Sequence, residues 1–179
     1  PSLVGFGDVY KRQVILLSIS QMSETLFILA IPFFLRYFGI KQVMLISMFA
    51  WVFRFGLFGF GDPGSGLWML ILSMIVYGMA FDFFNISGSL FVEQETSSNI
   101  RASAQGLFFM MTNGLGAIIG GYASGAVVDA FSVYADGKLV SREWPEIWLI
   151  FAAYALVIGI LFALVFKYKH RPEEAVNKK

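Results

Sequence analysis

Among the polar and aromatic side chains inside long apolar stretches of the sequence, six are the main candidates for chemistry. They are Gln21, Glu24, Arg54, Tyr77, Phe81 and Asp82. A carboxylate can bind and release a proton, an amide can hydrogen-bond a sugar or a base, and an aromatic ring can stack on a flat ligand. Because a charge buried in hydrocarbon costs about 2.5–3.5 kcal/mol, each charged residue among them is a candidate for function.

The spacing of these residues places them on shared helix faces. Gln21 and Glu24 are three residues apart, and Tyr77 and Phe81 are four apart, so each pair shares one face of an α-helix. At ~1.5 Å per residue, the six candidates lie about 15 to 22 Å from one end of their predicted helices. Secondary transporters bind their substrates at this depth, near the middle of the bilayer.

Five apolar stretches must position these side chains. Each has roughly the 20 residues that a helix needs to cross ~30 Å of hydrocarbon, and short polar segments separate them. Since a chain in lipid must satisfy its own backbone hydrogen bonds, we expect an all-α membrane protein with five transmembrane helices. The predicted spans are residues 14–35, 41–60, 67–92, 102–131 and 146–167.

The composition excludes several classes of protein. Of the 179 residues, 58% are hydrophobic and only 14% are charged, whereas soluble domains carry about 25% charged residues. A water-soluble enzyme and a disordered chain are therefore excluded. The net charge of +1 excludes a nucleic-acid-binding protein, because no basic field is available to hold phosphates. The chain has no G-x-x-x-x-G-K-[ST] motif, so we expect neither ATP nor another cofactor.

Positive charges gather in alternate connecting segments. Arg36 and Lys41 bound the first of these segments, Arg101 ends another, and five lysines and arginines lie between Lys167 and Lys179. The positive-inside rule predicts that these segments, including a basic tail at residues 168–179, lie in the cytoplasm. Residues 1–13 show no clear period and begin without methionine, so we interpret them as a non-native leader or a truncated loop.

Two other interpretations of the polar residues remain open. Buried polar side chains often only join helices, and Arg54 could simply pair with Asp82 or Glu24. The residues Gly59-Phe-Gly-Asp62 match the G-x-G-D pattern of intramembrane aspartyl proteases, so a hydrolase that uses Asp62 and Asp82 is a rival hypothesis. That motif is weak, because Asp62 begins a Pro-Gly turn and lies outside the predicted spans.

Three runs of sequence resemble the bacterial nucleoside:proton symporters of the major facilitator superfamily. They are Ser18-Ile-Ser-Gln-Met-Ser-Glu-Thr-Leu-Phe27, the run from Ser73 to Gly88, and Arg101-Ala-Ser-Ala-Gln-Gly106. The resemblance extends from about residue 14 to 170, and residues 1–13 match nothing in the family. It implies that the spans in residues 14–167 correspond to helices eight to twelve of a permease, whose N-terminal half and seventh helix are missing.

The resemblance also implies roles for the candidate residues. The family's nucleoside contacts correspond to Gln21, Glu24, Tyr77 and Phe81, and a buried carboxylate would carry the coupled proton. Glu24 is the first candidate for that carboxylate, and Asp82 is the second.

We therefore predict proton-coupled nucleoside uptake across a bacterial inner membrane by alternating access, without enzymatic chemistry. The partners would be a nucleoside, a proton, the lipid bilayer and the missing half. The main alternative is a transporter of the same fold for a sugar or another small metabolite, and a structural membrane module without a substrate is a further one.

Overall fold

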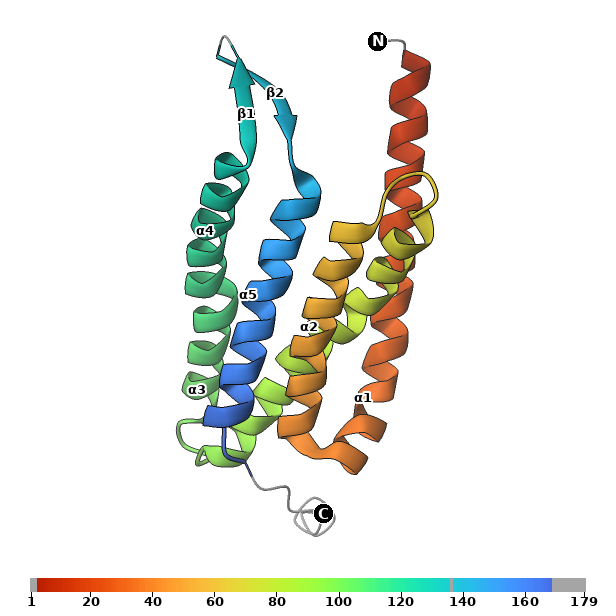
Figure 1. Cartoon of the computed structure of the whole chain (residues 1–179). Helices are drawn as coiled ribbons and strands as arrows, with labels where there is room; N and C mark the ends of the chain where they lie inside the picture. Colours follow the sequence, from red (N-terminus) through yellow and green to blue (C-terminus); the bar gives the residue numbers. More distant parts are fainter. Residues whose placement is uncertain (1–2, 136, 169–179) are drawn as a thin grey trace.

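The computed structural model describes residues 3–135 and 137–168, and helices make up most of them (Figure 1). The expected tail at 168–179 therefore lies, beyond its first residue, outside the described part of the chain. In chain order the elements are α1 (Leu3–Phe60), α2 (Leu67–Glu95), α3 (Arg101–Phe109), the π-helical turn η1 (Met110–Leu115), α4 (Gly116–Ala130), β1 (Ser132–Ala135), β2 (Lys138–Arg142) and α5 (Trp144–Val165).

Helix α1 folds back on itself at Gly39. This residue has a φ of 75° and a ψ of 168°, which is a left-handed conformation that glycine adopts at little cost. Figure 1 shows the chain running toward one end of the molecule and returning from it at this point. We call residues 3–38 the first half of α1 and residues 40–60 its second half. The predicted spans 14–35 and 41–60 thus lie in one assigned helix and are joined without a loop.

Four helical segments are long and apolar enough to cross a membrane in the described part of the chain. They are Leu17–Phe60, Leu67–Glu95, Arg101–Ala130 and Trp144–Val165. This confirms the expected helical membrane architecture. The first segment has 44 residues, and at ~1.5 Å per residue this length would be about twice the thickness of the hydrocarbon core.

The core forms where α2 packs against both halves of α1. Phe83 of α2 is fully buried with Ile31 of the first half and Val43 of the second half. Ala50 of the second half packs with Val76 and Ala80 of α2 in a further cluster. This packing keeps the two halves of α1 and the middle of α2 in fixed relative positions.

The segment between α4 and α5, one of the short polar segments between the predicted spans, forms a β-hairpin. Strands β1 and β2 pair antiparallel, and Gly137 at the turn has a φ of 72°. The sequence signal was present, because Asp136-Gly137 is a preferred turn dipeptide and β-forming residues flank it. The predicted span 102–131 also differs in detail, since the π-helical turn η1 interrupts it.

Three of the positively charged segments lie at one end of the molecule. The turn at Gly39, the α2–α3 connection and the end of α5 are together at the bottom of Figure 1. Lys41 Nζ donates a hydrogen bond of 3.0 Å to the carbonyl of Ala163, and Tyr168 donates one of 3.1 Å to Gln94 Oε1. Lys41 thereby satisfies a carbonyl in the last turn of α5, where no helical N–H is available.

Candidate functional site

A close helix crossing brings the candidate residues of α1 and α2 together. A Cβ added to Gly78 would lie 2.7 Å from the backbone nitrogen of Glu24 and 2.9 Å from the carbonyl carbon of Ser23. The Ser23 hydroxyl donates a hydrogen bond to the Ile75 carbonyl across the same crossing. Small residues allow membrane helices to approach in this way. Sequence reasoning missed both Ser23 and Gly78, although a glycine within an apolar helix is a recognisable signal.

Tyr77 and Phe81 form an aromatic pair beside this crossing. Their rings are stacked, with centroids 5.8 Å apart and an angle of 22° between the planes. Tyr77 is half-buried and Phe81 is 38% exposed, so one ring is held by its neighbours and the other is open to a ligand. The predicted four-residue spacing therefore does produce a continuous aromatic surface on α2.

The polar candidates of the first half of α1 lie at the same level. Gln21 is exposed and Glu24 is half-buried. The backbone of Glu24 lies against Gly78, the residue that follows Tyr77 on α2. Together with the aromatic pair, these side chains offer an amide, carboxylates and ring faces in one region, which matches the needs of a ligand with hydroxyls and a flat base.

Asp82 is the most enclosed of the candidate residues. Only 9% of it is exposed, and its Oδ2 atom has no hydrogen-bond partner among the described residues. An unpaired carboxylate oxygen inside a membrane protein is costly, which is typical of groups retained for function. Asp82 follows Phe81 on α2, but it is buried whereas Phe81 is exposed, as expected for consecutive residues of a helix.

Arg54 has different partners from the carboxylates that the sequence suggested. Its Nη1 atom donates a hydrogen bond of 2.9 Å to the Ser73 carbonyl. Its guanidinium carbon lies 4.5 Å from the centroid of the Tyr77 ring. In the described part of the chain Arg54 forms no ion pair, and the expected pairing with Asp82 or Glu24 is absent from this structure.

Asp62, the aspartate of the G-x-G-D pattern, has a structural role in the α1–α2 turn. Its Oδ1 accepts a hydrogen bond of 2.6 Å from the Gly64 backbone N–H, and its Oδ2 accepts one of 3.1 Å from Gly66. Asp82 lies 15 residues beyond the start of α2, which is about 22 Å along a helix. The two aspartates therefore do not form the pair that an aspartyl protease needs.

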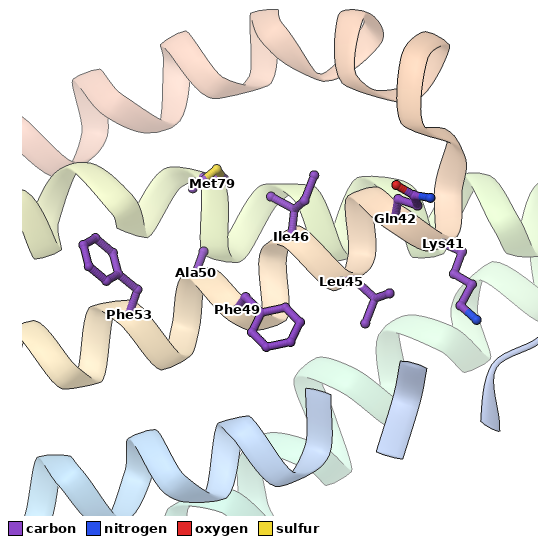
Figure 2. A pocket seen from close by; sticks show the side chains of 8 residues that line it. All are labelled: Lys41, Gln42, Leu45, Ile46, Phe49, Ala50, Phe53 and Met79. Carbon is purple, nitrogen blue, oxygen red and sulfur yellow. The ribbon is translucent and has the colours of Figure 1, made fainter. Parts of the chain in front are cut away.

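An apolar groove runs along the second half of α1, apart from the candidate residues (Figure 2). Its volume is about 600 Å³. Every lining residue except Met79 of α2 comes from the second half of α1, and Lys41 lies at one end of the groove in Figure 2. The lining residues are Lys41, Gln42, Leu45, Ile46, Phe49, Ala50, Phe53 and Met79.

A smaller hollow of about 340 Å³ lies between α2 and α3. Its lining includes Asn85, Ser89 and Phe109. Ser89 is held there by Gln105, whose Nε2 donates a hydrogen bond of 2.7 Å to the Ser89 carbonyl. Neither this hollow nor the groove is lined by the predicted binding residues Gln21, Glu24, Tyr77 and Phe81, which lie on α1 and α2.

Comparison with known proteins shows which family the chain resembles. A family model described as nucleoside H+ symporter matches residues 3–171. The match includes residues 3–13, contrary to the expectation that the first thirteen residues have no counterpart in the family.

Two curated relatives from Escherichia coli (strain K12) are similar along most of the chain. A xanthosine permease is 60% identical over 176 residues, which are 97% of this chain and 41% of that protein. The nucleoside permease NupG is 59% identical over 163 residues, which are 90% of this chain and 38% of that protein. The chain thus spans about two fifths of the length of these relatives.

A solved structure also resembles the chain. The crystal structure of the nucleoside transporter NupG superposes with a TM-score of 0.77 at 59% sequence identity. The superposition covers 87% of this chain and 37% of that one.

Proposed function

Because the chain belongs to the nucleoside H+ symporter family, we propose that it is part of a bacterial permease that carries nucleosides into the cell together with protons. The family match over residues 3–171 is the observation that carries this proposal. Transport by alternating access forms and breaks no covalent bond, so the protein is a transporter and not an enzyme. The transporting unit is the complete permease, since the chain spans about two fifths of its relatives.

The nucleoside binds to the surface formed by Gln21, Glu24, Tyr77 and Phe81. The exposed face of Phe81, backed by Tyr77, offers a stacking surface for the base. Gln21 and Glu24 supply hydrogen-bond donors and acceptors for the ribose hydroxyls or the edge of the base. The close crossing at Gly78 supports this assignment, because it keeps the polar and the aromatic groups within reach of one ligand.

Glu24 is the carboxylate that carries the coupled proton, and Asp82 is the second candidate. Glu24 lies beside Gln21 and is half-buried, so substrate binding can change its surroundings directly. A group whose environment changes during the cycle can take up a proton in one state and release it in another. Asp82 is more enclosed, with only 9% of it exposed, so a bound ligand would reach it less readily than Glu24.

The chain crosses the bacterial inner membrane five times, as helices eight to twelve of a major facilitator fold. The reversal at Gly39 supports this count, because it divides the 44-residue apolar segment into two antiparallel passages. The positively charged end of the molecule, with the C-terminus, faces the cytoplasm. The lack of lysine and arginine in the α1–α2 turn at the opposite end supports this orientation.

A helix of the missing part of the permease fills the apolar groove on the second half of α1. Phe49 and Phe53 are about half exposed there, at 46% and 51%. Large aromatic side chains that are this exposed within a membrane-spanning segment require an apolar neighbour. The N-terminal half of the same permease then completes the nucleoside site from the other side.

Uptake by the complete permease tests the proposed function. Cells that express it should accumulate labelled uridine, and a protonophore should abolish that accumulation. Unlabelled adenosine should compete with uridine, whereas glucose should not. Competition by glucose alone would instead favour the alternative, a transporter of the same fold for a sugar.

A further inference from the structure

Arg54 is a charged residue within an apolar membrane-spanning segment, and it has no acidic partner in the described part of the chain. Placing a guanidinium in such a segment is unfavourable, so its contacts must compensate and its presence calls for a role. The contacts are of two kinds, with a backbone carbonyl and with aromatic rings.

The carbonyl contact links the second half of α1 to α2. Arg54 Nη1 donates to the Ser73 carbonyl at 2.9 Å, and the Ser73 hydroxyl donates back to the Arg54 carbonyl at 3.4 Å. Ser73 is fully buried. This reciprocal pair places the guanidinium beside Tyr77, because Tyr77 lies four residues, or about one helical turn, after Ser73 on α2.

The aromatic contacts place the guanidinium among three rings. Its central carbon lies 4.5 Å from the Tyr77 centroid, 5.1 Å from that of Phe58 and 5.7 Å from that of Trp51. All three distances are within the range of a cation–π interaction, and the contact with Tyr77 is the shortest. Trp51 also contacts Tyr77 edge-on, with ring centroids 6.0 Å apart.

The Tyr77 ring is therefore held by contacts from α1, and the same ring supports Phe81. Arg54 and Trp51 contact it from the second half of α1, and among the described residues its other aromatic neighbour is Phe81 of the proposed nucleoside surface. Without these contacts a half-buried tyrosine could adopt other side-chain rotamers. A ring that is already held in its binding orientation costs less to order when the ligand arrives.

We propose that Arg54 is a positioning residue for nucleoside binding: it holds the Tyr77 ring against Phe81 without touching the substrate. This inference rests on the proposed function, because it takes the Tyr77 and Phe81 surface as the place where the base stacks. It gives the half-buried Arg54 cation a part in substrate affinity, in place of the ion pair with a carboxylate that the sequence left open.

The test is a double-mutant cycle in the complete permease. Arg54→Gln retains a donor for the Ser73 carbonyl but removes the charge above the ring. It should raise the dissociation constant for uridine about three- to tenfold, and it should raise KM for uptake while Vmax remains unchanged. In a Tyr77→Leu background the same change should have no further effect, because the ring on which Arg54 acts is gone.

Two control variants separate this role from general stabilisation of the fold. Arg54→Lys retains a cation and should keep affinity within about twofold of the unmodified permease. Phe58→Leu removes another ring contact of Arg54 without touching Tyr77, and it should leave uridine affinity unchanged.

The positioning role would be overturned if Arg54→Gln caused an equal loss of affinity with Tyr77 present and with Tyr77→Leu. It would also be overturned if Arg54→Gln left the dissociation constant for uridine unchanged in the permease that retains Tyr77. A lower Vmax with unchanged KM would also overturn it, because a purely structural residue gives that result. If the unmodified permease binds no uridine, the proposed function itself is wrong. If it binds uridine but the two substitutions cause additive losses, only the positioning role of Arg54 is wrong.

Discussion

At the scale of single residues, Phe81 is the side chain on which nucleoside affinity should depend most directly. Its ring is 38% exposed and stacked on Tyr77. In the complete permease, Phe81→Ala should weaken uridine binding by about 1–3 kcal/mol, the scale of base–aromatic stacking. Phe81→Tyr should retain most of the affinity, because it retains the ring. Equilibrium binding of labelled uridine measures both variants.

The matched control for this prediction is Phe60→Ala. Phe60 is 69% exposed at the end of α1, away from the crossing at Gly78. The Phe60→Ala variant should bind uridine as tightly as the unmodified permease does. If Phe81→Ala also does so at normal expression, Phe81 does not belong to the nucleoside site.

Glu24 should separate proton coupling from binding. Glu24→Gln keeps the shape and the hydrogen-bonding capacity of the side chain but cannot ionise. We expect the variant to bind uridine and to exchange it across the membrane, but to lose uphill accumulation. Uptake with and without a protonophore, beside equilibrium binding, measures the two activities separately.

Glu146→Gln is the control for Glu24, since Glu146 is exposed in the first turn of α5. The Glu146→Gln variant should accumulate uridine as the unmodified permease does. Protonophore-sensitive accumulation by Glu24→Gln would transfer the coupling role to Asp82, the other carboxylate of the region.

At the scale of the elements, the crossing of α1 and α2 depends on the absence of a side chain at Gly78. The backbone of Ser23 and Glu24 occupies the space that a Cβ would need, at distances of 2.7 to 2.9 Å. Backbone cannot move aside as the end of a side chain can. Gly78→Ala should therefore push the helices apart and destabilise the protein by about 1–3 kcal/mol, as overpacking does.

Thermal unfolding of the purified permease in detergent measures this effect. Gly121→Ala is the control, because a Cβ there would meet nothing within 4 Å. It should unfold at the temperature of the unmodified protein or slightly above, since alanine favours helix. Equal unfolding temperatures for the two alanine variants would show that α1 and α2 cross less closely than described.

At the scale of the whole molecule, the two ends should lie on opposite sides of the membrane. Ser65 is exposed in the α1–α2 turn, and Ser98 is exposed in the α2–α3 connection at the positively charged end. This chain contains no cysteine, so single cysteines can report accessibility once any cysteines elsewhere in the permease are replaced. A membrane-impermeant thiol reagent applied to intact cells should label Ser65→Cys and not Ser98→Cys. The reverse pattern would invert the proposed orientation.

Features that depend on composition and local spacing were predictable from the sequence. The apolar stretches predicted membrane helices because hydrocarbon leaves a backbone few other choices. The four-residue spacing of Tyr77 and Phe81 predicted a shared face because helix geometry is local. The runs from Ser18 to Phe27 and from Ser73 to Gly88 predicted the family that the comparison then showed.

Tertiary structure decided which side chains meet across helices. The sequence left open a pairing of Arg54 with Asp82 or Glu24. The structure instead places Arg54 at the Ser73 carbonyl and the Tyr77 ring, because the register of α1 on α2 sets what lies within its reach. The same register places Gly78 against the backbone of Glu24. Contacts between distant residues follow from how whole helix surfaces pack, and the local pattern of one helix does not contain that information.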